Sequence, residues 1–236
     1  MLCNIAELLV DVPEAGGLAP RCRAYQAEEN ENRQADIVID AALYEPERFP
    51  GCSEQTIAYM ESGRFFSRGI LKHNGTKLHA SAVAYQGKAY LFSGPSGTGK
   101  STHTRLWQQV FGPDAQVFND DKPAIRLLDG KWYAYGTPWC GKDGININIK
   151  VPLAGICFLR QSKENVIRRL TAEEASINVM WQSTQFIAKE NMDLHINLVD
   201  KLVRMIPIYE MENNMQPDCA HLSFETMRQG AEEAGL

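Results

Sequence analysis

Residues 94 to 101 have the residue types and the spacing of a phosphate-binding loop. The run GPSGTGKS satisfies the pattern G-x-x-x-x-G-K-[ST] at every position. Glycines let backbone N–H groups converge on an anion without a Cβ in the way, and a following helix directs its free N–H groups to the same point. Lys100 would neutralise the outer phosphates and Ser101 would bind Mg²⁺. The residues expected to contact the nucleotide are Gly94, Ser96, Gly97, Thr98, Gly99, Lys100, Ser101 and Thr102.

Two polar groups flank this loop in the sequence. Asp120 and Asp121 end the run VFNDD downstream of the loop, and His79 lies upstream in LHASAV. Phosphoryl transfer requires charge neutralisation, in-line positioning and a carboxylate near the nucleophile. Two adjacent carboxylates stay ionised beside Mg²⁺, because the ion offsets their repulsion. Taken alone, the acid pair could also be a solvated strand end, and a lone histidine on an alternating strand is usually structural.

The order of these pieces resembles that of two families, the HPr kinase/phosphorylases and the ATP-dependent phosphoenolpyruvate carboxykinases. Both have a histidine in H-x-S-A or H-G, a short hairpin, SGxGK[ST] and a strand ending in DD; the matching pieces here lie within residues 77–160. The resemblance implies an α/β fold of mixed α+β character. It implies a carboxykinase-like P-loop core, in which helices flank a mixed β-sheet, and ATP and Mg²⁺ as cofactors.

The resemblance also implies roles for individual side chains. Asp121 would be a metal ligand or an acid that organises the metal, and Asp120 would accept the substrate hydroxyl proton or hold a metal-bound water. Which acid has which role stays open. His79 would approach the metal and the γ-phosphate. The metal candidates are therefore Ser101, Asp120 and Asp121, and Lys100 joins both acids and His79 as a catalytic candidate.

The glycine-containing segment 136–147 loosely resembles the substrate loop that follows the acid pair in HPr kinases. The arginine-glycine pair of those enzymes is missing, and Lys142 is the nearest cation. Lys142 could stabilise transition-state charge, or it could be a surface lysine on a turn. Cys140 is expected to be a packed small residue, and Arg160 an ion-paired arginine.

Three functions follow from these residues. The first is an ATP- and Mg²⁺-dependent kinase whose acceptor is a serine of a peptide or protein, or a small hydroxylated metabolite. The second is a carboxykinase, which LHASAV and SGTGKST resemble more closely. Carboxykinases are much longer, however, and here Arg64 and Arg68 are the nearest arginines before the core. The third is a non-catalytic ATP-binding accessory protein of a peptide-modification pathway, against which Lys100, Ser101 and the acid pair argue.

The elements that must position these residues are clearest from residue 68 onward. Alternating apolar residues predict strands, turn residues such as Gln86-Gly87 and Asp129-Gly130 predict hairpins, and steps of three and four residues predict helices. The expected strands span 35–40, 77–85, 88–94, 115–121, 153–161, 165–170 and 206–211, with a further hairpin over 123–135. The expected helices span 101–111, 171–180 and 184–204.

Some parts of this pattern allow narrower expectations. Residues 53–66 could be a helix or an irregular surface segment. Asp218 is expected to cap a closing helix. Leu194, Leu198, Leu202 and Met205 are expected to pack in the core, whereas His103 is expected to be exposed.

Composition limits the possible partners. The 236 residues carry a net charge of −5 without a Lys/Arg cluster, so we expect no nucleic acid partner. The six cysteines show no metal or redox spacing. No apolar run reaches membrane-spanning length, which predicts a cytoplasmic protein without a membrane partner. A homo-oligomer is possible. Residues 1–70 are expected to form a strand and loop segment packed on a core of residues 71–236, within what could be a single domain.

Overall fold

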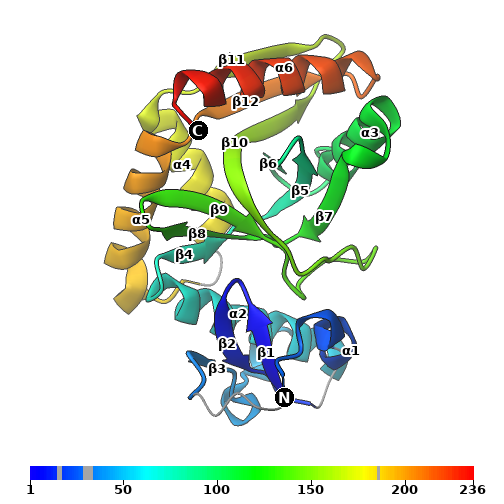
Figure 1. Cartoon of the computed structure of the whole chain (residues 1–236). Coiled ribbons are helices and arrows are strands. Elements are labelled where there is room, and N and C mark those ends of the chain that lie inside the picture. The colour runs from blue at the N-terminus through cyan, green and yellow to red at the C-terminus, as the bar shows by residue number, and fades with distance from the viewer. Residues whose placement is uncertain (15–17, 29–33, 185–186) are drawn as a thin grey trace.

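The computed structural model describes residues 1–14, 18–28, 34–184 and 187–236. A curled nine-stranded mixed sheet forms its centre, and a three-stranded sheet lies at the N-terminal end (Figure 1). The strands are β1 (Leu2–Ile5), β2 (Leu8–Asp11), β3 (Ile37–Val38), β4 (Gly75–Lys77), β5 (Ala80–Tyr85), β6 (Lys88–Ser93), β7 (Gln116–Asp121), β8 (Ala124–Leu128), β9 (Lys131–Tyr135), β10 (Lys150–Gln161), β11 (Val166–Arg169) and β12 (Ile208–Asn213). The helices are α1 (Ala19–Cys22), α2 (Glu54–Leu71), α3 (Lys100–Phe111), α4 (Ala172–Ser183), α5 (Met192–Met205) and α6 (Asp218–Glu233). The expected fold class, a mixed sheet flanked by helices, is confirmed.

The long strand β10 joins the two parts of the large sheet. The main path runs β4-β8-β9-β10-β6-β5-β7, and β12 adds to β10 with β11 beside it. The start of β10 pairs antiparallel with β9, whereas its later residues pair parallel with β6 and β12. A register shift between Leu153 and Gly155 lies where the partner changes. The sheet therefore bends around one continuous strand.

The register of three neighbouring strands gathers the residues that the sequence singled out. Strand β5 lies between β6 and β7 and pairs antiparallel with both. Ala80, the first residue of β5, lies opposite Ser93 on one side and Asp121 on the other. The histidine before β5, the loop after β6 and the acids that end β7 are therefore side by side at one edge of the sheet.

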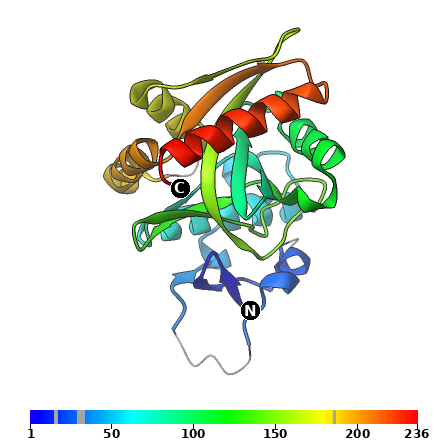
Figure 2. The same cartoon turned by 45° about the horizontal axis from the view of Figure 1, so that its top comes forward.

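Helices cover both faces of the large sheet because its central strands are apolar on both sides. Along β6, Tyr90 and Phe92 join one core cluster with α3 and α6, while Ala89 and Leu91 join another with α4 and α5. This alternation follows the period of two in a strand. Figure 2 shows α6 lying across the sheet, with α3 at one side and α4 and α5 at the other.

Helix α2 connects the N-terminal sheet to the large sheet. Ser53 caps the helix, because its Oγ accepts a hydrogen bond from the Thr56 amide at 3.3 Å. Phe66 and Ile70 pack in one core with residues of β1–β3 and with Tyr135 and Trp139. The segment over 53–66 is thus a helix, and strands β1 and β2 were not predicted.

Several narrower expectations were wrong. Leu194 is 47% exposed, because the buried face of α5 consists of His195, Leu198, Val199 and Leu202. Leu198 and Leu202 are buried as predicted and Met205 packs against the same core, so only Leu194 departs from the predicted stripe. The helix predicted from residue 184 begins at Met192, and residues 185–186 lie outside the described part of the chain.

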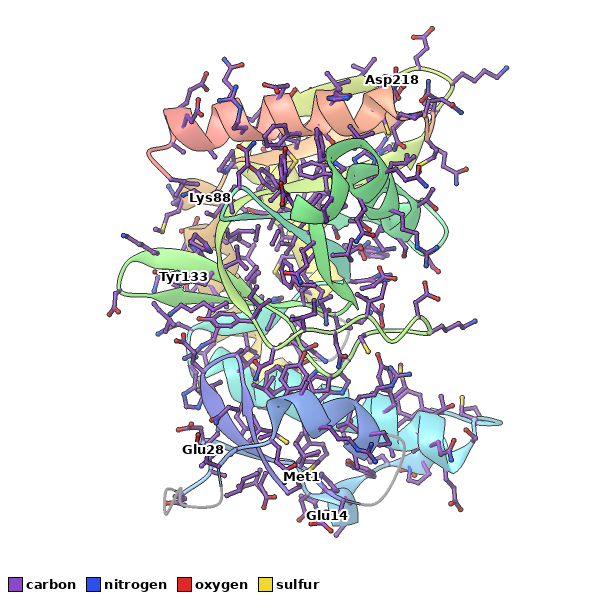
Figure 3. The ribbon with its side chains drawn as sticks, turned by 45° about the vertical axis from the view of Figure 1, so that its right-hand side comes forward. Met1, Glu14, Glu28, Lys88, Tyr133 and Asp218 are labelled. Atoms are coloured by element: carbon purple, nitrogen blue, oxygen red, sulfur yellow. The ribbon has the colours of Figure 1, made fainter. Side chains whose placement is uncertain are left out.

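Two polar residues also differ from expectation. Asp218 is the first residue of α6 and caps no backbone amide; its carboxylate accepts a hydrogen bond from Asn165 Nδ2 at 2.9 Å. Figure 3 shows Asp218 at the opposite end of the molecule from Met1. His103 is fully buried. Its ring has a partner there, because Nε2 lies 2.9 Å from Ser223 Oγ on α6. None of the described helices combines the length and the hydropathy needed to cross a bilayer.

Candidate functional site

The glycine loop between β6 and α3 has a backbone that side chains would disturb. Gly94, Gly97 and Gly99 have φ of 138°, 85° and 94°, a region that favours glycine. A Cβ at Gly99 would also overlap the Met215 methyl group. Helix α3 starts directly after the loop at Lys100. The predicted strand, glycine loop and helix are therefore all present.

The lysine and the hydroxyl of the loop have defined partners. Lys100 Nζ donates hydrogen bonds to the carbonyls of Gly94 and Pro95, both at 2.9 Å. Burial lowers the pKa of Lys100, as does the positive charge of Lys122. Ser101 Oγ donates to Asp120 Oδ1 at 2.9 Å. The first acid of the pair is thus held against the start of α3.

Asp121 is the centre of a separate group of polar contacts. Its Oδ1 lies 2.7 Å from Lys122 Nζ and 3.5 Å from His79 Nε2, and its Oδ2 accepts a hydrogen bond from the Tyr59 hydroxyl at 3.3 Å. Its φ is 120°, an uncommon value for a residue with a Cβ. Strained backbone of this kind is concentrated at active sites and ligand clamps.

His79 is held on two sides. Its Nδ1 lies 3.1 Å from Gln182 Oε1, and its backbone N–H donates to the Gln182 carbonyl at 3.1 Å. Burial lowers the pKa of His79 to about 4, and the positive charges of Lys122 and Lys100 act in the same direction. The ring is therefore neutral at pH 7. Nδ1 faces Gln182 Oε1 and Nε2 faces Asp121 Oδ1, so a neutral ring can donate its one proton to only one of these two oxygens.

Two cavities meet at this group. A polar cavity of about 620 Å³ follows the loop and the start of α3. A cavity of about 1050 Å³ lies beside it and shares His79, Ser96 and Asp121 with it. The larger cavity extends between α2 and α4, and its lining is mostly apolar. Asp121 therefore stands where the cavity along the glycine loop and the larger cavity adjoin.

The structure brings most of the predicted site residues together. Those that line the polar cavity are His79, Ser96, Gly97, Gly99, Lys100, Ser101, Thr102, Asp120, Asp121 and Lys142. Gly94 and Thr98 line a third cavity, of about 540 Å³, on the other side of the loop. Lys142 is exposed, next to Asp143, which forms an ion pair with Arg105 of α3. Its place is compatible with either predicted role.

Two neighbouring predictions are confirmed. Cys140 is buried, and its Sγ accepts a long contact from Arg21 Nη1 at 3.6 Å. Burial raises the pKa of its thiol, which favours a packed residue over a nucleophile. Arg160 is ion-paired with Glu210 at 2.6 Å.

The residues around Asp121 and the larger cavity that sequence reasoning missed include Tyr59, Lys122, Ile177, Trp181 and Gln182. Lys122 directly follows the acid pair, so its proximity was available from the sequence. Tyr59 lies on α2 and Gln182 at the end of α4, far from Asp121 along the chain. Only the folded chain brings them to the acid.

The oxygen atoms near the loop fit a magnesium ion. Mg²⁺ prefers hard oxygen ligands and usually takes one or two protein carboxylates, with phosphates and waters completing its shell. Ser101 Oγ and the Asp120 carboxylate supply such a pair in the polar cavity. Within the described ranges, no cluster of three or more His, Cys, Asp or Glu side chains could hold a metal alone. Both observations fit an ion that arrives with a nucleotide.

Comparisons with known proteins add little to this geometry. The sequence matches no family model and no curated protein. Among solved structures, the chain is similar to the Hpr(Ser) kinase/phosphatase from Coxiella burnetii, with 10% identity and a TM-score of 0.37. The match covers 66% of this chain and 90% of that one. A likeness this weak carries no functional argument, so function has to be argued from the site itself.

Proposed function

We propose that this protein is an ATP- and Mg²⁺-dependent phosphotransferase that transfers the γ-phosphoryl group of ATP to a hydroxyl group. One observation carries the proposal. The Asp121 carboxylate lies at the junction of the loop cavity and the larger cavity, where it could serve a nucleotide and an acceptor together.

The contacts of the two acids favour different roles for them. Asp120 accepts the Ser101 hydroxyl, which is the position of a carboxylate that organises the metal in P-loop enzymes. Asp121 faces the larger cavity and is held by Tyr59 and Lys122. We therefore assign Asp120 to the metal and Asp121 to the acceptor hydroxyl.

The reaction can be written with these residues. The acceptor oxygen forms a bond to the γ-phosphorus, and the bond from that phosphorus to the β–γ bridging oxygen breaks. ADP leaves with the electron pair, and Asp121 takes the hydroxyl proton. Lys100 and the loop N–H groups stabilise the negative charge on the phosphates. Bound Mg²⁺ would supply further neutralisation at those oxygens. The neutral His79 places Nε2 3.5 Å from Asp121 Oδ1.

The carboxykinase alternative is not favoured. An organic acid requires free cations, and no arginine is among the described residues that line the two cavities sharing Asp121. Three of the lysines that line them have partners within the protein: Lys77 donates to the Gly63 carbonyl, Lys100 to the Gly94 carbonyl, and Lys122 pairs with Asp121. Arg64 is buried and ion-paired with Glu61 and Glu45. It is therefore committed to the fold.

Transfer of label from ATP tests the proposal. The protein would be incubated with γ-labelled ATP, Mg²⁺ and a panel of free serine, small polyols and serine-containing peptides. We expect label in one class of acceptor. Asp121→Asn should reduce transfer by about 10²-fold or more and leave ATP affinity nearly unchanged.

Two further variants serve as controls for that assay. Lys100→Ala should weaken ATP binding itself, and Asp120→Asn should raise the Mg²⁺ concentration that the reaction requires. Label that appears only as inorganic phosphate, with every acceptor, would contradict a kinase. Unchanged transfer in Asp121→Asn would contradict the role of this acid.

A further inference from the structure

We infer that the acceptor is a hydroxyl-bearing side chain flanked by apolar residues in a peptide, and that Ile177 and Trp181 of α4 select it. The inference rests on the proposed phosphotransfer and names its acceptor. It depends on the size of the larger cavity, on the exposed side chains at its rim and on the position of its polar groups.

The cavity is much larger than a small acceptor. Its volume of about 1050 Å³ lies at the upper end of the range for drug-sized ligands, about 300–1,000 Å³. Free serine or a small polyol would leave most of it to water. A ligand with several side chains would fill it and would still place one hydroxyl beside Asp121.

The rim of this cavity exposes a tryptophan, the largest type of apolar side chain. Trp181 is 80% exposed, whereas Trp107, Trp132 and Trp139 are at most 2% exposed. Ile177, one helical turn earlier on α4, is 64% exposed and lines the same cavity. Exposed aromatic side chains beside a cavity are typical binding contacts, because they gain the most from being covered.

The remaining apolar wall continues inward from this rim. Met180 comes from α4, Met60 from α2, and Trp139 from the segment after β9. The ring of Trp139 is stacked on Phe66 at 4.7 Å, which fixes this wall. Methionine adapts its shape to different apolar partners. The wall therefore suits apolar side chains without demanding one exact shape.

Most polar side chains that line the cavity already bind other groups of the protein. Away from the loop, Lys77 Nζ donates to the Gly63 carbonyl at 2.7 Å, and the hydroxyls of Ser176 and Thr184 donate to backbone carbonyls of α4. Tyr59, His79 and Lys122 all contact Asp121, and Gln182 contacts His79. A sugar or polyol would need hydrogen-bond partners along its whole length, and unpaired buried hydroxyls are costly. A cavity whose polar side chains are mostly paired within the protein fits an acceptor with a single hydroxyl beside Asp121.

A peptide fits better than a compact apolar alcohol because the apolar surface continues out of the cavity. Ile177 and Trp181 lie on the solvent side of α4, where a chain leaving the cavity would cross them. The next residue, Gln182, touches His79 through both its side chain and its backbone. The helix that would bind the flanking residues therefore also positions the catalytic histidine.

A peptide series tests the selection. Each peptide would carry one serine at the same position, between Leu and Phe flanks or between Asn and Gly flanks of equal length. We expect kcat/KM to be at least about tenfold higher for the apolar flanks. Trp181→Ser and Ile177→Ser should each remove most of that preference, and Ile177→Ser should leave the KM for ATP unchanged because Ile177 lines only the larger of the three cavities. Val166→Ser is the matched control, because Val166 is 53% exposed on β11 and lines none of the three cavities.

Tryptophan fluorescence gives a readout that does not require transfer. Since the other three tryptophans are buried, acrylamide should quench mainly Trp181. The apolar peptide should protect Trp181 from the quencher, and the polar peptide should not. Protection without any phosphoryl transfer would remove the proposed kinase and leave the peptide site standing.

Two results would overturn the inference. One is transfer to free serine or a polyol with a kcat/KM that Trp181→Ser does not change. The other is concentration-dependent self-association that Trp181→Ser abolishes, combined with no protection by any peptide. That second result would make the α4 surface a contact between copies of this chain.

Discussion

The backbone of Asp121 makes a prediction that reverses the usual order of two substitutions. In an ordinary strand, a protein with glycine is less stable than the same protein with alanine by about 0.5–1 kcal/mol, because glycine loses more backbone entropy on folding. At Asp121 the φ of 120° strains any residue with a Cβ, at about 1–3 kcal/mol. Both substitutions remove the carboxylate and its contacts, so their difference isolates the backbone.

The expected magnitude follows from these two terms. The Asp121→Gly variant should be more stable than Asp121→Ala by about 1 kcal/mol, within a range of about 0–2.5 kcal/mol. The neighbouring Asp120 has no positive φ, so Asp120→Gly should be less stable than Asp120→Ala by about 0.5–1 kcal/mol. Adjacent positions of one strand thus serve as test and control.

Urea unfolding followed by far-UV circular dichroism measures both differences. In a chain of this size, 1 kcal/mol corresponds to about 2–4 °C in Tm, so a thermal scan gives a second reading. The reasoning is refuted if alanine is as stable as glycine at position 121. It is also refuted if the glycine variant is more stable than the alanine variant by the same amount at positions 120 and 121, because the effect would then not depend on φ.

Three further perturbations test the surroundings of the site. Gln182→Leu should lower kcat by about tenfold or more and leave ATP affinity unchanged, because His79 loses the partner of Nδ1. Gln182→Glu should keep most of the activity and move the acid limb of the pH–rate profile to higher pH. Gly99→Ala should weaken ATP binding measured by calorimetry, and adding Met215→Ala should restore part of it, since the new Cβ overlaps the Met215 methyl group. Burial lowers the pKa of His103 in the folded protein to about 3, whereas the ordinary pKa of histidine is about 6.5. Below pH 6.5 the unfolded chain therefore binds a proton that the folded protein does not. The free energy of unfolding falls as the pH drops below that value. Between pH 7 and pH 5 this loss amounts to about 2 kcal/mol, and a urea titration of His103→Gln should show a pH dependence reduced by that amount.

The part of the fold around the loop was predictable because its signals are local. The turn residues Gln86-Gly87 and Asp129-Gly130 and the glycine pattern each act within a few residues, and the corresponding elements are confirmed. The proximity of His79 to Asp121 was implied by the family resemblance, and the two side chains do lie 3.5 Å apart. Their functional roles stay predictions.

The rest depends on contacts between distant segments. Nothing near Tyr59 in the sequence indicates that its hydroxyl reaches Asp121, and Gln182 lay where the sequence indicated only a break between helices. His103 was expected to be exposed, since no neighbouring residue in the sequence indicated a partner for its ring. The partner is Ser223, which lies on α6, far along the chain. Its burial could not be read from the helix pattern alone.

The position of α2 has a consequence for how this protein could be re-engineered. This helix supplies a hydroxyl to Asp121 and one wall of the larger cavity, yet it lies outside the strands that hold the glycine loop. Grafting only the segment from β5 to β10 into another scaffold would carry the loop and both acids but leave Asp121 without the Tyr59 hydroxyl. A transplant would have to include α2, and exchanging side chains on α2 and α4 offers a route to new acceptors with the loop left intact.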